Sequence, residues 1–306
     1  MPQEFELVSH DRFSGLKVFV VRLQSRRPHI HRELELGLLL EGELLLRQGG
    51  KSRRVQKNDC YLINSLDAHD FESADSNTLV LAVQISPMIF EPFMKDAAQL
   101  RFQTGSSLTE FFPEESERGQ QLRSILLELA KKYFCRGDEN ALYCCYLAAK
   151  LMLLLYQHIP TDTLSNRDYA SMRRKADRIV AITDYIDHNF HSKLLLEEIA
   201  EKHGLTMTYV SHLFKDSLGI SFQDYLKEKR FEYALFLLSS TDKSILDICM
   251  ESGFSDQRYM TGAFRDKFGC TPAEYRKLHP PRLSEYHPND INQQEFLPPE
   301  EALALF

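Results

Sequence analysis

The chain has 306 residues, of which 43% are hydrophobic and 26% are charged, and its formal net charge at pH 7 is −7. This length accommodates two domains with separate cores, and the composition argues against a disordered or fibrous chain. The most apolar run, 147–156, is interrupted by Lys150 and is too short to cross a bilayer. Because the first residues lack the basic and apolar segments of a signal peptide, we expect a cytoplasmic protein with no membrane partner.

The first part of the chain, 5–86, has the pattern of short β-strands. Runs such as LKVFVVRL and ELGLLLEGELLL alternate with polar or glycine-containing turns, which predicts a barrel or sandwich. After residue 86 the pattern becomes helical, with helices predicted over 87–95, 115–135 and 139–158. The last of these is apolar on more than one face, which fits burial against the barrel or against a second subunit.

One predicted strand of this part carries ionisable side chains at alternate positions. Starting from His29, the odd positions are His29, His31, Glu33 and Glu35, while the even positions are mostly apolar. Alternation along a single strand places these four side chains on one face. Such a face fits a pocket for a small molecule, a metal site or a solvated surface.

The spacing HxHxxxExxxxxxG, from His29 to Gly42, resembles the first motif of cupin barrels. The stretch NDCYLINSLDAHDF, 58–71, is similar to the second cupin motif, with His69 at the position of its histidine. Three imidazoles and one carboxylate are ligands that suit Mn, Fe, Ni or Zn. In metal-binding cupins, the divalent metal is held at the positions of His29, His31, Glu35 and His69.

The last third of the chain contains the same short sequence motif twice, at 196–225 and 245–275. Gly204 in the first copy aligns with Gly253 in the second, and the later landmarks keep their spacing after one inserted residue. Landmarks that keep their register over such a length indicate an internal repeat.

Each copy predicts a helix, a turn with glycine, and a second helix. Thr206 and Ser255 are placed to cap the second helices, and one long helix from Ser221 to just before Thr241 joins the two copies. A single copy would equally fit a helical hairpin that only packs. Two copies at a fixed spacing favour a pair of helix-turn-helix motifs, whose second helices enter the DNA major groove.

Residues 194–276 resemble the DNA-binding domain of the AraC/XylS family of bacterial transcription regulators, most specifically over GFSDQRYMTGAF-R-KFG-TP-EYR. In regulators of this kind a cupin-type barrel is a sensory domain, often for sugars or related metabolites. The resemblance implies an α+β protein, with an N-terminal cupin-like β-barrel followed by helices and a C-terminal all-α domain with two helix-turn-helix motifs joined by a long helix. It also implies a transcription regulator that is not an enzyme and needs no cofactor.

The outward side chains of the two second helices align with family positions that contact DNA. Gln257 and Arg258 have forked groups that match adenine and guanine, and Lys215 and Arg265 are expected at phosphates. Gly262 occupies a position where the family commonly has arginine. The expected DNA contacts are Met207, Thr208, Ser211, His212, Lys215, Gln257, Arg258, Thr261, Gly262 and Arg265.

The domain boundaries follow from breaks in periodicity and from charge. We predict a sensor domain over 1–159, a linker over 160–172, and a DNA-binding domain over 173–279. Residues 280–306 are rich in proline and acids and predict a flexible tail, in which 303–306 is apolar enough to dock on a surface. Between residues 171 and 279 there are 16 Lys and Arg and 16 Asp and Glu, so DNA contacts depend on local placement rather than on net charge.

Two functions stay open. The first is a homodimeric transcription regulator that binds double-stranded DNA. It is controlled by a small molecule, expected to be a sugar or related metabolite, that binds at His29, His31, Glu33, Glu35 and His69. The second is a metal-dependent cupin enzyme fused to a DNA-binding domain, with metal on His29, His31, Glu35 and His69. We expect the first, without a metal. The sequence identifies neither the effector nor the operator.

Overall fold

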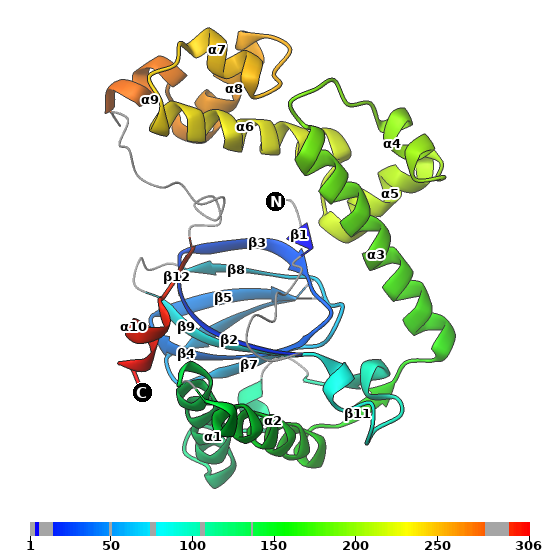
Figure 1. The fold of residues 1–306 in the computed structure, drawn as a ribbon, viewed down its shortest axis with the longest axis vertical. Coiled ribbons are helices and arrows are strands. Elements are labelled where there is room, and N and C mark those ends of the chain that lie inside the picture. The colour runs from blue at the N-terminus through cyan, green and yellow to red at the C-terminus, as the bar shows by residue number, and fades with distance from the viewer. Residues whose placement is uncertain are drawn as a thin grey trace. The chain divides into compact units, whose positions relative to one another are not determined.

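A computed structural model describes residues 4–5, 15–48, 51–73, 78–104, 108–135, 137–278 and 294–306 (Figure 1). One unit contains 3–176 and 292–306, and the other contains 177–291. The boundary lies within the long helix α3 (Asn166–Asn189). None of the helices in the described part of the chain combines the length and apolarity needed to span a bilayer.

The N-terminal unit is built on two five-stranded sheets. The first has the order β12-β2-β9-β4-β7, with every neighbouring pair antiparallel. Its strands are β12 (Gln294–Phe296), β2 (Leu16–Leu23), β9 (Leu79–Ile85), β4 (Leu34–Glu41) and β7 (Cys60–Ile63). The second has the order β1-β3-β8-β5-β6. Its strands are β1 (Glu4–Phe5), β3 (Ser25–Ile30), β8 (His69–Ser73), β5 (Glu43–Gln48) and β6 (Lys51–Gln56).

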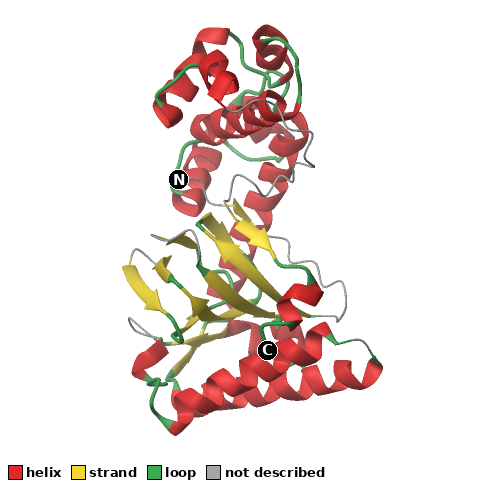
Figure 2. Ribbon diagram, turned by 90° about the vertical axis from the view of Figure 1, so that its left-hand side faces the viewer, coloured by secondary structure: helices red, strands yellow, loops and turns green. Residues whose placement is uncertain are grey.

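Alternating side chains of the first sheet build two separate cores. Val21 and Leu39 point toward the second sheet, where they pack with Leu44 and Phe71. Leu36 belongs to the other core, beneath the helices α1 (Glu117–Phe134) and α2 (Asp138–His158). Figure 2 shows these helices against the sheets. Because β4 is covered on both faces, its buried residues are nearly continuous. The predicted α+β class, with a sheet-rich N-terminal domain and a helical C-terminal domain, is confirmed.

Two local predictions in this unit are wrong. The predicted helix over 87–95 is only a short 3-10 helix, η1 (Pro87–Ile89), because Pro92 cannot donate the backbone hydrogen bond that a longer helix needs. The strand predicted to run on from His29 is broken at 31–33, where the chain passes from β3 in one sheet to β4 in the other.

The segments predicted as linker and tail also differ from expectation. Residues 161–163 form β11 (Thr161–Thr163), which pairs with β10 (Leu100–Phe102), and Ser165 then caps α3 by accepting from the Asp168 backbone N–H at 3.1 Å. Residues 280–293 lie outside the described part. The rest of the tail is ordered as β12 and α10 (Pro299–Leu303), and Leu303 and Phe306 pack on the helix-covered core.

The C-terminal unit contains the two predicted helix-turn-helix motifs. Their helices, with the final helix, are α4 (Leu196–Lys202), α5 (Met207–Leu218), α7 (Ile245–Glu251), α8 (Gln257–Phe268) and α9 (Pro272–Leu278). The joining helix α6 (Phe222–Ser240) is capped by Ser221 and ends at Thr241, as predicted. Thr206 caps α5, but the cap of α8 is Asp256 rather than Ser255, because the Asp256 carboxylate accepts from the Arg258 backbone N–H.

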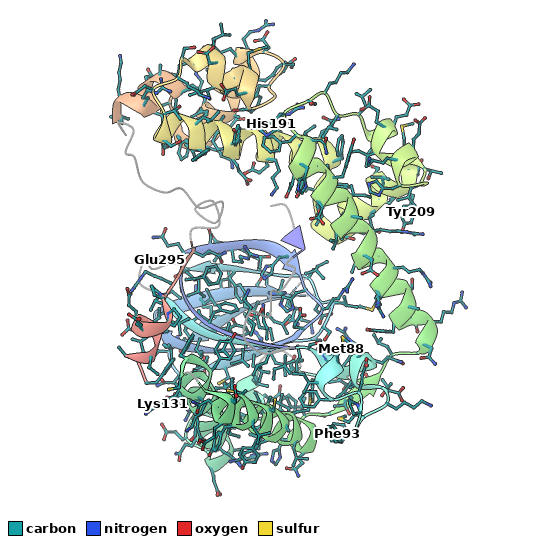
Figure 3. All side chains as sticks on the ribbon, in the orientation of Figure 1. Met88, Phe93, Lys131, His191, Tyr209 and Glu295 are labelled. Carbon is teal, nitrogen blue, oxygen red and sulfur yellow. The ribbon has the colours of Figure 1, made fainter. Side chains whose placement is uncertain are left out.

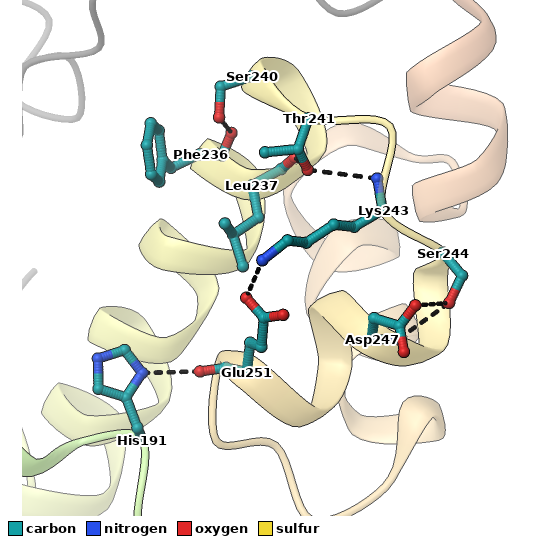
Figure 4. A network of polar contacts seen from close by, with 9 residues as sticks. All are labelled: His191, Phe236, Leu237, Ser240, Thr241, Lys243, Ser244, Asp247 and Glu251. Carbon is teal, nitrogen blue, oxygen red and sulfur yellow. Dashed lines mark hydrogen bonds and ion pairs between the residues drawn. The ribbon is translucent and has the colours of Figure 1, made fainter.

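Polar contacts hold the start of the second motif in place and tie it to the segment that follows α3 (Figure 4). The Lys243 ammonium is 2.5 Å from the Glu251 carboxylate, and Ser244 caps α7. The His191 Nδ1 atom, labelled in Figures 3 and 4, lies 2.7 Å from the Glu251 carbonyl oxygen. The next glycine, Gly253, has φ +75°, and a Cβ atom there would lie 2.4 Å from the Phe190 carbonyl oxygen. This turn therefore requires glycine.

The two turn glycines provide a matched test. Gly204 also has a left-handed φ, +63°, but a Cβ atom there meets nothing within 4 Å. Gly204→Ala should cost about 1–2 kcal/mol from backbone strain alone. Gly253→Ala should cost clearly more, since backbone atoms must also move, and urea unfolding of the full chain measures both. Equal losses would show that the close approach to Phe190 does not constrain the turn.

Candidate functional site

Three buried histidines meet between the sheets of the N-terminal unit. His29 and His69 are cross-strand partners in β3 and β8, and their ring centroids are 4.0 Å apart. His31 follows β3, and its ring centroid lies 5.0 Å from that of His69. One nitrogen from each of the three rings lies within 4.8 Å of the others, and all three side chains are buried. The structure thus brings together the histidines of both predicted motifs.

Glu35 reaches this cluster from β4 in the opposite sheet. Its carboxylate accepts hydrogen bonds from Tyr61 Oη at 3.1 Å and Gln84 Nε2 at 2.9 Å, and it lies 3.0 Å from His31 Nε2. Burial by itself raises the pKa of Glu35, but the hydrogen bond and charge of His31, with help from His69 and Gln84, outweigh burial and lower it. The network thus favours the ionised form of Glu35 between the two sheets.

His31 is the positive partner of this carboxylate. Its Nδ1 atom is 3.0 Å from the Glu33 carbonyl oxygen, and its Nε2 atom faces Glu35. Because both partners are acceptors, both ring nitrogens donate, and His31 is an imidazolium. The pair is buried, with side-chain exposures of 0% and 3%. Glu33 is also buried, but it enters this network through its backbone carbonyl.

His69 differs from His31 in protonation. Its Nδ1–H donates to the Asp67 carbonyl oxygen at 3.0 Å, while its Nε2 atom is buried and has no hydrogen-bond partner. Burial, together with the nearby His29 and His31, holds the pKa of His69 well below its usual range. A neutral imidazole with a bare Nε2 lone pair is an acceptor for a ligand hydroxyl or a potential metal ligand. Gln84 Oε1 is a second buried acceptor without a partner.

A small cavity of about 30 Å³ lies beside the cluster. Val21, Phe71 and Val80 provide apolar walls, and His29 and Glu35 provide polar ones. The sequence did not predict the further lining residues Tyr61, Gln294 and Phe296. Tyr61 sits in an apolar run, and the other two lie in the segment predicted as a tail.

The histidines also bear on the metal site that the cupin resemblance implies. Within the described residues, His29, His31 and His69 are the one group of three that offers suitably placed ligand atoms, and Glu35 is not part of it. The bare Nε2 atom of His69 fits a ligand. His31, however, has both nitrogens engaged and would have to release Glu35 or the Glu33 carbonyl to bind a metal. The residues therefore fit a metal only after rearrangement.

The second candidate site is the outward face of α5 and α8, the second or recognition helices of the two helix-turn-helix motifs. On α5, Val210 and Phe214 are buried, whereas the predicted contacts Met207, Thr208, Ser211, His212 and Lys215 are all exposed. On α8, Gln257, Arg258 and Arg265 are exposed, and Thr261 and Gly262 are half-buried. The structure places these residues on accessible faces, and their contact with DNA stays a prediction.

Two neighbours of the recognition helices were not predicted. Arg258 donates from Nη2 to Asp256 Oδ2 at 2.8 Å, and this hydrogen bond, with that from its backbone N–H, lowers the pKa of Asp256 to about 2. Beside α5, Arg178 of α3 donates to the Tyr209 hydroxyl at 2.7 Å and stacks over its ring. Tyr209 is labelled in Figure 3. Arg178 thus places a positive charge next to α5.

The domains that carry these two sites both match models of known protein families. The helix-turn-helix domain model matches residues 199–278, and the AraC-like ligand binding domain model matches residues 21–146. The fold and sites thus define a class of protein that joins a ligand-binding sheet domain to a helix-turn-helix domain. The chain belongs to the AraC/XylS family of transcription regulators, as the sequence predicted.

Individual relatives are distant. An uncharacterized HTH-type transcriptional regulator of Staphylococcus aureus is 26% identical over 247 residues, which are 81% of this chain and 32% of the relative. YijO of Escherichia coli, also an uncharacterized HTH-type transcriptional regulator, is 29% identical over 56% of this chain and 58% of its own length. The chain therefore spans about a third of the length of the Staphylococcus relative. The solved C-terminal domain of the response regulator yesN from Fusobacterium nucleatum is 35% identical over 31% of this chain and 94% of that domain, with a TM-score of 0.30.

Proposed function

We propose that this protein is a sequence-specific DNA-binding transcription regulator, controlled by a small molecule that binds in the N-terminal barrel. The observation that carries the proposal is the combination of two exposed recognition helices with a buried polar cluster that retains unpartnered acceptors. Such acceptors are costly to bury unless something binds to them, and a sensor pocket supplies that reason. Binding to DNA would place the protein in the cytoplasm.

The DNA-binding surface would consist of α5 and α8. Because both motifs pack on α6, their recognition helices should enter two successive major-groove segments on one DNA face, about one helical turn apart. Arg258 would first leave Asp256, a change that water makes easy because the Arg258 side chain is 89% exposed. Lys215 and Arg265 would contact phosphates and position the helices.

The effector is proposed to be a sugar or a related hydroxyl-rich metabolite. His69 Nε2 and Gln84 Oε1 would accept hydrogen bonds from its hydroxyl groups. The Tyr61 and Phe71 rings in the cavity wall would cover its apolar faces. Apolar walls with a few placed polar groups are typical of small-molecule sites.

A thermal shift experiment with sugars, sugar acids and divalent metals tests this effector class. A ligand that binds the folded barrel increases the free energy of unfolding by mass action, by about 2.7 kcal/mol at one hundred times its Kd. The melting temperature therefore rises. We expect a shift with a sugar. His69→Phe, which keeps a ring but deletes the acceptor, should abolish that shift and leave affinity for duplex DNA unchanged. His158→Phe, in α2, is the matched control.

The metal-dependent enzyme is the alternative, favoured only by the group of three histidines. Stabilisation by Mn, Fe, Ni or Zn alone, lost in a His31→Ala, His69→Ala double variant, would contradict the sugar-sensor proposal and support the alternative.

The protein is also proposed to form a homodimer through α2. Apolar side chains spaced along one side of this helix are 50–75% exposed, namely Leu142, Tyr146, Leu153 and Tyr156. Exposed apolar stripes of this kind mark protein interfaces.

Leu153→Glu should therefore convert a dimer into a monomer, because it places a charge in the centre of the stripe. Light scattering after size-exclusion chromatography measures the mass. Met88→Glu, at another exposed apolar residue, labelled in Figure 3, is the control and should stay dimeric. A dimer that persists in Leu153→Glu would exclude this face.

A further inference from the structure

The C-terminal segment of the chain is part of the sensor unit, although the DNA-binding unit precedes it in sequence. β12 pairs antiparallel with β2, with Phe296 opposite Val21, and the Leu297 backbone N–H donates to the Val20 carbonyl oxygen at 2.9 Å. Farther along, Ala302 of α10 is fully buried, and the Phe306 ring stacks on Phe134 of α1. The segment therefore has a docked position of its own.

Strand alternation gives β12 an inner and an outer side. On the outer side Glu295 faces Arg22 at 3.6 Å, and their side chains are 75% and 41% exposed. Figure 3 labels Glu295 at this edge. On the inner side, Phe296 packs edge-on against Phe19, with ring centroids 5.3 Å apart, and it lines the barrel cavity together with Gln294. One wall of the cavity thus comes from β12, in the C-terminal segment of the chain.

The cavity is too small for the proposed effector while this wall is in place. A volume of about 30 Å³ holds one or two water molecules but no sugar. Most other walls are strands with a hydrogen-bonded neighbour on each side, and side chains such as Val80 and Ala82 of β9 are fully buried. β12 has three residues, lies at the edge of its sheet, and leaves Phe296 37% exposed. Of the walls of this cavity, β12 is therefore the one that can move with the lowest energetic cost.

We propose that β12 is a removable wall of the effector pocket, and that a bound effector takes the space of the Phe296 ring and releases β12 from β2. This rests on the proposed sensor function. The DNA-binding unit is joined to the sensor unit by the chain at both of its ends, through α3 and through residues 279–293. Release of β12 leaves the second connection anchored only through α10, where Ala302 and Phe306 stay docked, so that connection becomes longer and occupancy of the pocket changes how the DNA-binding unit is restrained.

Access to the cavity can be measured without knowing the effector. Val80→Cys introduces a thiol at a fully buried position that lines the cavity, and iodoacetamide labelling followed by mass spectrometry of the full chain gives its rate of exposure. Adding Phe296→Ala should accelerate labelling of this thiol at least about tenfold, because opening no longer has to move the ring. Adding Leu305→Ala, at an exposed residue of the same segment, should leave the rate unchanged.

The native thiol of Cys144, fully buried on α2 in the helix-covered core, is the internal control for general loosening. It should label slowly in every variant. If it accelerates with Phe296→Ala, Phe296→Leu replaces that variant, since it removes the ring but keeps apolar packing. An unchanged rate at position 80 beside a slow Cys144 would overturn the proposal.

A disulfide lock tests the link to the effector. Arg22 and Glu295 are directly opposed, and the alternation of bonds along the ladder makes theirs a hydrogen-bonded pair, with Cα atoms about 5.5 Å apart and within disulfide range. In oxidised Arg22→Cys, Glu295→Cys, a sugar that stabilises the wild type should give no shift, and reduction should restore it. The two single variants control for oxidation of native thiols.

The two experiments separate this inference from the function on which it rests. A full sugar response in the locked protein would overturn the removable wall and leave the sensor function intact. Failure of every sugar to stabilise the wild type would remove the proposed effector class, while the labelling rates at position 80 would still decide whether β12 moves.

Discussion

The buried ion pair between His31 and Glu35 is the constraint on which the sensor unit depends. The two residues lie on either side of the point where the chain crosses between sheets, and Glu35 also accepts from Tyr61 and Gln84. Removal of one partner from a buried pair costs about 3–5 kcal/mol, because the remaining charge is left uncompensated. The network therefore fixes the interior between the two sheets and leaves His69 neutral, with its Nε2 acceptor available.

The C-terminal unit presents two helices at its surface although its net charge is not basic. α6 supplies one side of the core for the second motif through Phe231, Ala234 and Leu238. Burial of one face of α5 and α8 fixes which side chains face outward. The positively charged side chains then matter through where they lie, as with Arg178, which is held next to α5 by its hydrogen bond to Tyr209. Geometry rather than total charge carries the proposed interaction with DNA.

Sequence patterns predicted structure most accurately where a motif occurs twice in the chain. The aligned turn glycines and the Ser221 cap placed the helix-turn-helix motifs, and the two cupin-like motifs identified the histidines that meet in the barrel. Local sequence patterns did not predict the features that depend on contacts between segments distant in sequence. The break at 31–33 depends on two sheets, Gln84 is recognised only through its contact with Glu35, and the docking of β12 depends on a free edge of β2 that no local pattern reveals.

The most direct test of the account is selection of binding sites from random double-stranded DNA by the full chain, read by sequencing. The account predicts enriched sites with two blocks about one helical turn apart. Ser211→Ala with His212→Ala should erase preference in one block only, and Gln257→Ala with Thr261→Ala in the other. Absence of any enriched sequence, or variants that leave both blocks unchanged, would contradict the central claim that the two helices read DNA together.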